Sequence, residues 1–104
     1  MDHSLSTLGL AKKANLLAIG GEAVAIAIRH GKARLVITAT DASEGSARRA
    51  RVNAEMNGVK YEAVPYTKFE LGSITGRGSP GTVAFLDAGL AKGFLKKLQR
   101  REQE

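Results

Sequence analysis

Residues 20–43 read GGEAVAIAIRHGKARLVITATDAS and decide the fold, because they hold two apolar segments separated by a basic turn. The second segment, residues 34–40, is short and rich in β-branched side chains, which predicts a buried strand. The first segment, residues 23–28, is ambiguous. Its valine and isoleucines alternate with alanine, as in a strand, whereas the alanines and the stop at Gly31 favour a helix. Periodicity alone leaves both a hairpin and a helix–strand unit open.

Helical and extended patterns alternate on both sides of this stretch. Residues 5–14 place apolar side chains on one helical stripe, and the apolar run at 16–19 predicts an edge strand or an extended link. Downstream, Asp41 followed by Glu44 resembles a capping box and opens a predicted helix that ends at Gly58. Three alanines of that helix are expected to face inward: Ala47, Ala50 and Ala54.

The next segments predict a strand, a short helix and a loop. Residues 59–64 alternate weakly, which favours a short strand. Thr67 is a candidate N-cap for a short helix, whose Phe69 and Leu71 are expected to turn toward the core. Residues 72–81 contain four glycines and are expected to be largely loop.

The chain closes with a strand and a long helix. Residues 82–86 predict another buried strand, and Asp87 is expected to cap a helix that runs through Leu98. Three side chains spaced by four residues mark its inward side: Leu90, Phe94 and Leu98. The charged residues 99–104 are expected to form a frayed tail. Strands therefore alternate with helices, which predicts a single α/β domain over residues 1–104, with its core at about 4–98.

Composition places the chain among ordinary globular proteins, with 104 residues of which 43% are hydrophobic and 25% charged. The sequence has no cysteine, which excludes disulfides and thiolate metal sites. His3 and His30 are far apart in sequence, so a histidine metal site is not expected either. No apolar run is long enough for a membrane span, and no secretion signal is recognisable. We therefore expect a cytoplasmic protein with no membrane association, no metal and no cofactor.

The formal net charge of +6 favours binding to polyanions, with an affinity that falls as salt rises. The basic residues fall in four clusters: Lys12 and Lys13; Arg29, Lys32 and Arg34; Arg48, Arg49 and Arg51; and Lys92, Lys96, Lys97, Arg100 and Arg101. Three of the four clusters lie on predicted helices, where a solvated face is the commoner explanation. Charge alone therefore does not establish a nucleic-acid role.

The segment GRGSPG at residues 76–81 matches the pattern G-x-G-x-x-G. In a dinucleotide site that pattern lies between a strand and a following helix, whose N-terminus meets the phosphates. Here the loop follows a predicted helix and enters a predicted strand, so we reject a dinucleotide site. The carboxylates of the chain show no pairing that could support acid–base catalysis, and we expect no enzymatic activity.

Two glycine-bearing segments could nevertheless meet phosphate. Arg77 in the loop could pair with a phosphate or stack on a base, although an exposed loop arginine is the simpler interpretation. Gly20 and Gly21 at a possible helix start could present backbone N–H groups to phosphate, although a turn also explains them. Together with the basic charge, these segments favour nucleic acid only weakly.

Three long segments carry a family resemblance: residues 5–43 (LSTLGLAKKANLLAIGGEAVAIAIRHGKARLVITATDAS), 59–76 (VKYEAVPYTKFELGSITG) and 82–98 (TVAFLDAGLAKGFLKKL). In these three segments the chain resembles the kink-turn-binding ribosomal protein superfamily of the L7Ae type. Within that superfamily it is most similar to the small bacterial YlxQ-like members. The most specific pieces are AIRHGKARLVITATDAS at residues 27–43 and the TK-x-x-LG pattern that begins at Thr67. The resemblance implies a three-layer α/β/α sandwich with a central mixed sheet of about four strands, in which residues 21–30 are helical.

The family binds structured RNA, usually a kink-turn, and the resemblance implies the same function here, with rRNA and the ribosome as expected partners of a monomer. The family's recognition site joins the start of the second helix to the loop before the last strand. By this resemblance the RNA-binding residues are Gly20, Gly21, Glu22, Ala23, Ile26, Gly76, Arg77, Gly78 and Ser79.

This sequence departs from the family pattern at three of these positions. The family's glycine and small residue are retained as Gly20 and Gly21, but its asparagine, glutamate and lysine are replaced. Their positions hold Glu22, Ala23 and Ile26. Polar side chains that read base edges supply specificity, whereas phosphate contacts mainly position a protein on RNA. A second hypothesis is therefore a protein-interaction adaptor on the same fold, because Ile26 would leave apolar surface where the family has a cation.

Overall fold

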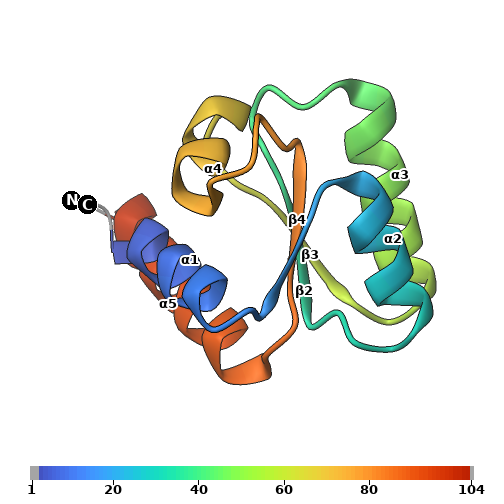
Figure 1. Ribbon diagram of the computed structural model, residues 1–104, viewed down its shortest axis with the longest axis horizontal. Helices are drawn as coiled ribbons and strands as arrows, with labels where there is room; N and C mark the ends of the chain where they lie inside the picture. Colours follow the sequence, from blue (N-terminus) through green and yellow to red (C-terminus); the bar gives the residue numbers. More distant parts are fainter. Residues whose placement is uncertain (1–2, 104) are drawn as a thin grey trace.

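The computed structural model describes residues 3–103, in which five helices alternate with four strands (Figure 1). Their order is α1 (His3–Lys13), β1 (Leu17–Ile19), α2 (Gly21–Arg29), β2 (Leu35–Thr38), α3 (Glu44–Met56), β3 (Lys60–Ala63), α4 (Lys68–Thr75), β4 (Thr82–Phe85) and α5 (Ala88–Gln103). This alternation confirms the predicted α/β class.

The four strands form one mixed sheet in the order β1-β4-β2-β3. β2 pairs in parallel with β3 and antiparallel with β4, and β1 pairs antiparallel with β4. Every residue of β2 and β4 is buried, as expected for central strands that are covered on both faces. β1 lies at one edge of the sheet, in agreement with the edge strand considered for residues 16–19.

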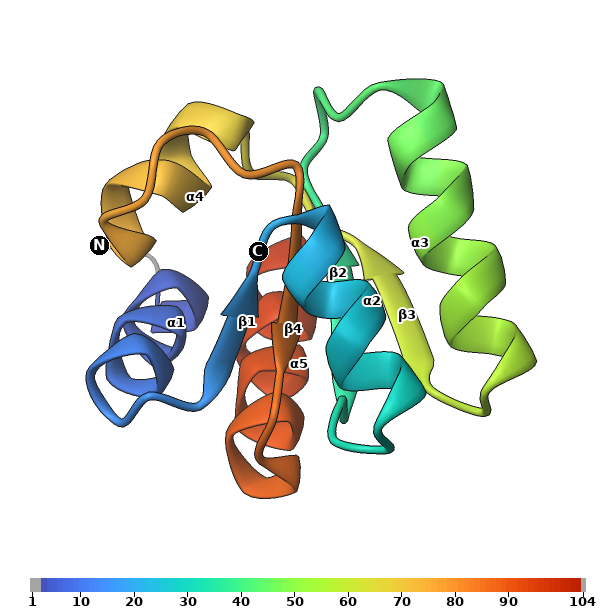
Figure 2. The same ribbon diagram turned by 45° about the vertical axis from the view of Figure 1, so that its right-hand side comes forward.

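Helices cover both faces of the sheet, which confirms the three-layer architecture. α2 and α3 lie on one face, and α1, α4 and α5 lie on the other (Figure 1, Figure 2). Successive side chains of β2 divide between the two cores, because side chains alternate across a strand. Leu35 and Ile37 belong to the core with α1, α4 and α5, whereas Val36 belongs to the core with α2 and α3.

The ambiguous segment at residues 23–28 is helical and lies within α2. Val24, Ala27 and Ile28 are buried, which is the i, i+3, i+4 spacing of one helix face. A half-buried strand would have placed Val24, Ile26 and Ile28 on one face, but Ile26 is 41% exposed. The family resemblance, and not the periodicity, identified this segment correctly.

The capping box predicted at the start of α3 is wrong. Ser43 is the N-cap, and its Oγ accepts a hydrogen bond from the backbone N–H of Ser46 at 3.2 Å. Asp41 lies two residues before that cap, and its Oδ1 accepts from the backbone N–H of Lys68 at 2.7 Å. That N–H belongs to the first turn of α4 and has no partner within the helix, so Asp41 ties the end of β2 to α4. The alanines expected to face inward are buried or half-buried: Ala47, Ala50 and Ala54.

The start of α4 has the cap that was predicted but not the predicted orientation of both apolar side chains. Thr67 Oγ1 accepts from the backbone N–H of Glu70 at 3.1 Å, and Glu70 Oε1 accepts from the backbone N–H of Thr67 at 3.0 Å. Leu71 is fully buried, but Phe69 is 75% exposed, so the inward orientation expected for Phe69 is wrong. Residues two apart lie about 200° apart around a helix and cannot share a face.

The glycine-rich segment is shorter as a loop than predicted. Residues 72–75 belong to α4, which ends where Gly76 adopts the left-handed conformation with φ 71°. Residues 76–81 alone connect α4 to β4, and they form the loop that we call the glycine loop. This loop follows a helix and enters a strand, in agreement with the rejection of a dinucleotide site.

The last helix starts at the predicted cap and ends later than predicted. Asp87 Oδ2 accepts from the backbone N–H of Leu90 at 2.9 Å. Phe94 and Leu98 are buried against the sheet. α5 continues to Gln103, so most of the segment expected to be a frayed tail is helical, and Glu104 lies outside the described residues.

We expect Thr67→Ala to lower the free energy of unfolding by about 1 kcal/mol, because it removes the side-chain acceptor of the capping box. Urea denaturation would measure the change. Thr40→Ala is the matched control, since Thr40 is exposed and lies outside any helix. Equal losses for the two variants would contradict the role given to the cap.

Candidate nucleic-acid interface

The start of α2 is fixed by Gly20, whose backbone has φ 96° and ψ 155°. This conformation is open essentially only to glycine. Gly20 is the N-cap of α2, and its N–H donates to the Thr82 carbonyl at 2.8 Å. The hydrogen bond joins the start of α2 to the residue at which the glycine loop enters β4.

The first turn of α2 presents backbone donors and a positive dipole end. The first intrahelical hydrogen bond runs from the Val24 N–H to the Gly20 carbonyl at 3.0 Å. The N–H groups of Gly21, Glu22 and Ala23 therefore have no acceptor within the helix. Gly21 and Glu22 are exposed, and Ala23 is half-buried. Such a helix start favours an anionic ligand.

The glycine loop packs directly on α4 at Gly72. A Cβ atom added at Gly72 would lie 1.8 Å from the Gly78 carbonyl oxygen and 2.8 Å from its carbon. Any side chain at Gly72 would therefore displace the loop. The outer part of the loop is exposed, at Gly76, Arg77, Gly78 and Ser79.

The glycine loop and the start of α2 both border one small hollow. Arg77 and Ala23 both line this hollow, of about 130 Å³. Residues of α1, of the α1–β1 connection and of β1 complete its wall: Lys12, Asn15, Leu17, Ala18 and Ile19. Two cations from distant parts of the chain, Arg77 and Lys12, therefore border the start of α2.

Lys12 was missed as a site residue by the sequence analysis. It belongs to the cluster with Lys13, which was explained as a solvated helix face. The available signal was its position in the last turn of α1, a few residues before the edge strand that leads into Gly20. Proximity to Arg77 depends on the pairing of β1 with β4 and could not be read from the sequence.

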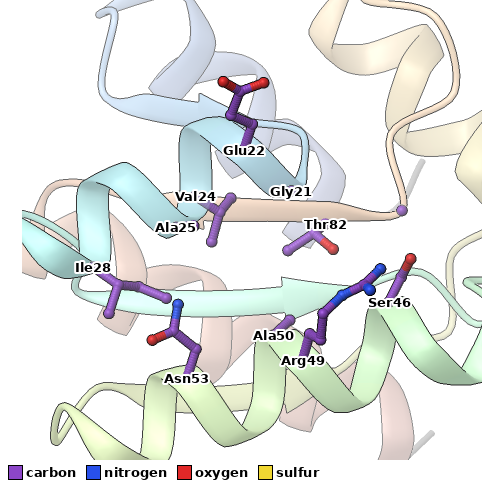
Figure 3. Close-up of a pocket in the computed structure, with 11 residues that line it drawn as sticks. Gly21, Glu22, Val24, Ala25, Ile28, Ser46, Arg49, Ala50, Asn53 and Thr82 are labelled. Carbon is purple, nitrogen blue, oxygen red and sulfur yellow. The ribbon is translucent and has the colours of Figure 1, made fainter.

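Two of the predicted site residues point elsewhere. Ile26 is 41% exposed and lies one turn beyond the start of α2, without lining the hollow. Glu22 lines a separate and larger cavity of about 550 Å³ between α2 and α3, shown in Figure 3, which we call the α2–α3 groove. Packing of the two helices creates this groove, and no local sequence pattern indicates it.

The other basic cluster near α2 lies at the opposite end of the helix. Lys32 and Arg34 follow the C-terminus of α2, and Arg34 Nη1 donates to the Gly31 carbonyl at 3.3 Å. A helix of nine residues is about 13.5 Å long. These two cations are thus separated from the hollow by the length of α2.

The described part of the chain contains neither a metal-binding cluster nor a membrane-spanning helix. Among residues 3–100, no cluster of three or more histidine, aspartate or glutamate side chains is suited to holding a metal ion. None of the helices in residues 3–103 is long and apolar enough to span a bilayer.

Comparisons with known proteins agree with this architecture. The chain is 34% identical over 91 residues to the RNA-binding protein YlxQ of Bacillus subtilis (strain 168), covering 88% of this chain and 86% of that protein. A protein of unknown function from Bacillus halodurans C has a similar structure, with a TM-score of 0.87 at 25% identity, covering 95% of this chain and 99% of that one. The Giardia lamblia 15.5kD RNA binding protein shares the fold, with a TM-score of 0.76 at 20% identity over 95% of this chain and 84% of that one. The model of the ribosomal protein L7Ae/L30e/S12e/Gadd45 family matches residues 2–94, and this chain therefore belongs to that family.

Proposed function

We propose that this protein is a non-enzymatic RNA-binding protein that recognises structured, kink-turn-like RNA at the edge formed by the α2 start and the glycine loop. We further propose that it acts as a cytoplasmic monomer on rRNA or the ribosome. One observation carries the proposal: Arg77 and Lys12 border the first turn of α2, which the Gly20–Thr82 hydrogen bond holds beside the loop. The name of the Bacillus subtilis relative, an RNA-binding protein, supports it.

The chemistry of this edge suits a folded RNA backbone. The unpaired N–H groups of the first helical turn can donate to phosphate oxygens, and the dipole adds positive potential at the same place. The Arg77 guanidinium can pair with a phosphate or stack on an unpaired base. Because Gly76 and Gly78 carry no side chains, the loop backbone can approach RNA closely.

The replacement of three family residues changes the expected ratio of base contacts to phosphate contacts. Glu22, Ala23 and Ile26 cannot supply the amide, carboxylate and cation that the resemblance associates with these positions. Phosphate contacts by backbone N–H groups, Arg77 and Lys12 therefore carry a larger share of binding. Such binding weakens steeply as salt rises, since each neutralised phosphate releases counterions.

The second candidate function is a protein-interaction adaptor. Ile26 is 41% exposed on α2, between the exposed Glu22 and Arg29. An apolar side chain in this position is a suitable contact for a protein partner. Capture of a protein through Ile26, together with no RNA binding by the wild type, would favour this function over the first.

Arg77→Ala should weaken binding to a kink-turn RNA hairpin more than Lys32→Ala does at near-physiological salt. A lost contact to a base costs on the order of 1–3 kcal/mol, or roughly 5- to 150-fold in affinity, and a lost phosphate contact costs less. Fluorescence anisotropy with the labelled hairpin would measure both variants.

Lys32 is the control because it is equally basic and lies beyond the other end of α2. Equal losses for the two substitutions would mean diffuse electrostatic attraction in place of a site. No hairpin binding by the wild type would overturn the proposed function.

A further inference from the structure

We propose that the α2–α3 groove binds a single-stranded RNA segment that flanks the structured element held at the α2 start. The inference rests on the proposed function and extends it to a second surface. It assigns a role to Arg49 and Asn53 of α3, which lie outside the edge described above.

The groove has one apolar side and one polar side. On the α2 side, the half-buried Ala25 offers apolar surface, and the buried Val24 and Ile28 also line the groove. Ser46, Arg49 and Asn53 follow one another at spacings of three and four residues, so α3 presents one polar side chain per turn along the opposite wall. In Figure 3, Ser46 and Arg49 lie near Thr82 at one end of the groove, and Asn53 lies near Ile28 at the other.

One end of the groove is continuous with the proposed RNA edge. Gly21 and Glu22 at the start of α2 line it, as do Gly81 and Thr82 where the glycine loop enters β4. An RNA strand that leaves the edge at this point can enter the groove without crossing another helix or strand. The groove volume of about 550 Å³ lies within the usual range of ligand sites, roughly 300–1,000 Å³.

The charges along the groove indicate how a strand would lie. Among residues 3–100, the ion pair on α3 joins Arg51 to Glu55 at 3.2 Å, and Arg49 has no carboxylate partner. Arg49 is therefore available to a phosphate. Glu22 on the α2 rim repels phosphate, so the RNA backbone is expected to follow α3 and the bases are expected to face α2.

An unpaired nucleotide matches these two sides better than a duplex does. A duplex keeps its base faces stacked and offers phosphates and 2′-hydroxyls to a protein, whereas an unpaired base offers apolar faces and a polar edge. The faces would contact the apolar surface at Ala25. Asn53 Oδ1 already accepts from Asn57 Nδ2 at 3.2 Å, which leaves the Asn53 amide N–H groups to donate to the base edge.

The test compares a kink-turn hairpin with the same hairpin carrying a short single-stranded extension, placed on its 5′ end or on its 3′ end. One extension should raise wild-type affinity by roughly tenfold, the order expected for one hydrogen bond from the Arg49 guanidinium to a phosphate. Arg49→Ala and Asn53→Ala should each remove most of this gain and leave the affinity for the blunt hairpin unchanged.

Arg48→Ala is the matched control, because Arg48 is an exposed arginine of the same helix that lines a different hollow, together with Tyr61 of β3. It should keep the gain. No gain from either extension, or an equal loss of gain in the Arg48 and Arg49 variants, would overturn the groove proposal while hairpin binding leaves the proposed function standing. Failure of the wild type to bind the blunt hairpin would overturn both, and a protein segment found in the groove would replace RNA as its occupant.

Discussion

Phe94→Ala should lower the free energy of unfolding by about 3–5 kcal/mol, the usual cost of removing a buried phenylalanine side chain. Phe94 is fully buried between α5 and the sheet. Its ring centroid lies 5.0 Å from that of Phe85 on the central strand β4, with the ring planes tilted by 43°. The substitution would therefore remove both buried apolar area and an aromatic pair.

The expected loss is a large share of the total stability, since the free energy of unfolding of a small domain is about 5–15 kcal/mol. Urea denaturation followed by circular dichroism would measure it. Phe69→Ala is the matched control, because Phe69 is 75% exposed on α4 and its removal should change stability by about 0.5 kcal/mol or less. Comparable losses for the two phenylalanines would mean that the faces of α4 or α5 are placed wrongly.

The contrast between the two phenylalanines shows which part of the fold the sequence determines locally. β2 and β4 were predictable because short β-branched runs suit strands covered on both faces. The caps at Thr67 and Asp87 were predictable because each side chain bonds an N–H three residues ahead. The face of Phe69 was mispredicted because apolar character alone does not choose between Phe69 and Leu71.

At Asp41 and in residues 23–28, long-range contacts determine the local structure. Asp41 has the local pattern of a cap for α3, but the path of the chain places it against the first turn of α4. Residues 23–28 satisfy both periods, and packing against α3 and the sheet selects the helix. In both places several local structures are compatible with the sequence, and long-range contacts select one.

The candidate site divides in the same way. The family resemblance indicated the start of α2 and the glycine loop, and the structure brings Ala23 and Arg77 to one hollow. Lys12 and the α2–α3 groove were missed, because both depend on which elements are neighbours in the sheet and in the helical layer. Whether the predicted residues contact RNA stays a prediction.

Gly72→Ala should weaken binding to the kink-turn hairpin by at least tenfold, about 1.4 kcal/mol, although Gly72 itself is buried and need not touch RNA. The new methyl group would meet the Gly78 carbonyl oxygen at 1.8 Å, whereas real Cβ contacts are essentially never shorter than 3.0 Å. The loop must therefore move outward by more than 1 Å at Gly78. Because Arg77 precedes Gly78 in the chain, its guanidinium would move with the loop and leave the start of α2.

Two comparisons separate this effect from a general loss of stability. Gly93→Ala introduces the same methyl group on α5, where no atom beyond the adjacent residues and the backbone of the helix itself lies within 4 Å. It should therefore leave RNA binding unchanged and stabilise the helix by about 0.5–1 kcal/mol. The second comparison is a double-mutant cycle with Arg77→Ala. If Gly72 acts by positioning the loop, the two losses should be strongly non-additive, since Arg77 has little left to contribute once the loop has moved. Additive losses, or a Gly72→Ala protein that binds the hairpin as tightly as the wild type, would show that RNA binding does not depend on the position of the glycine loop.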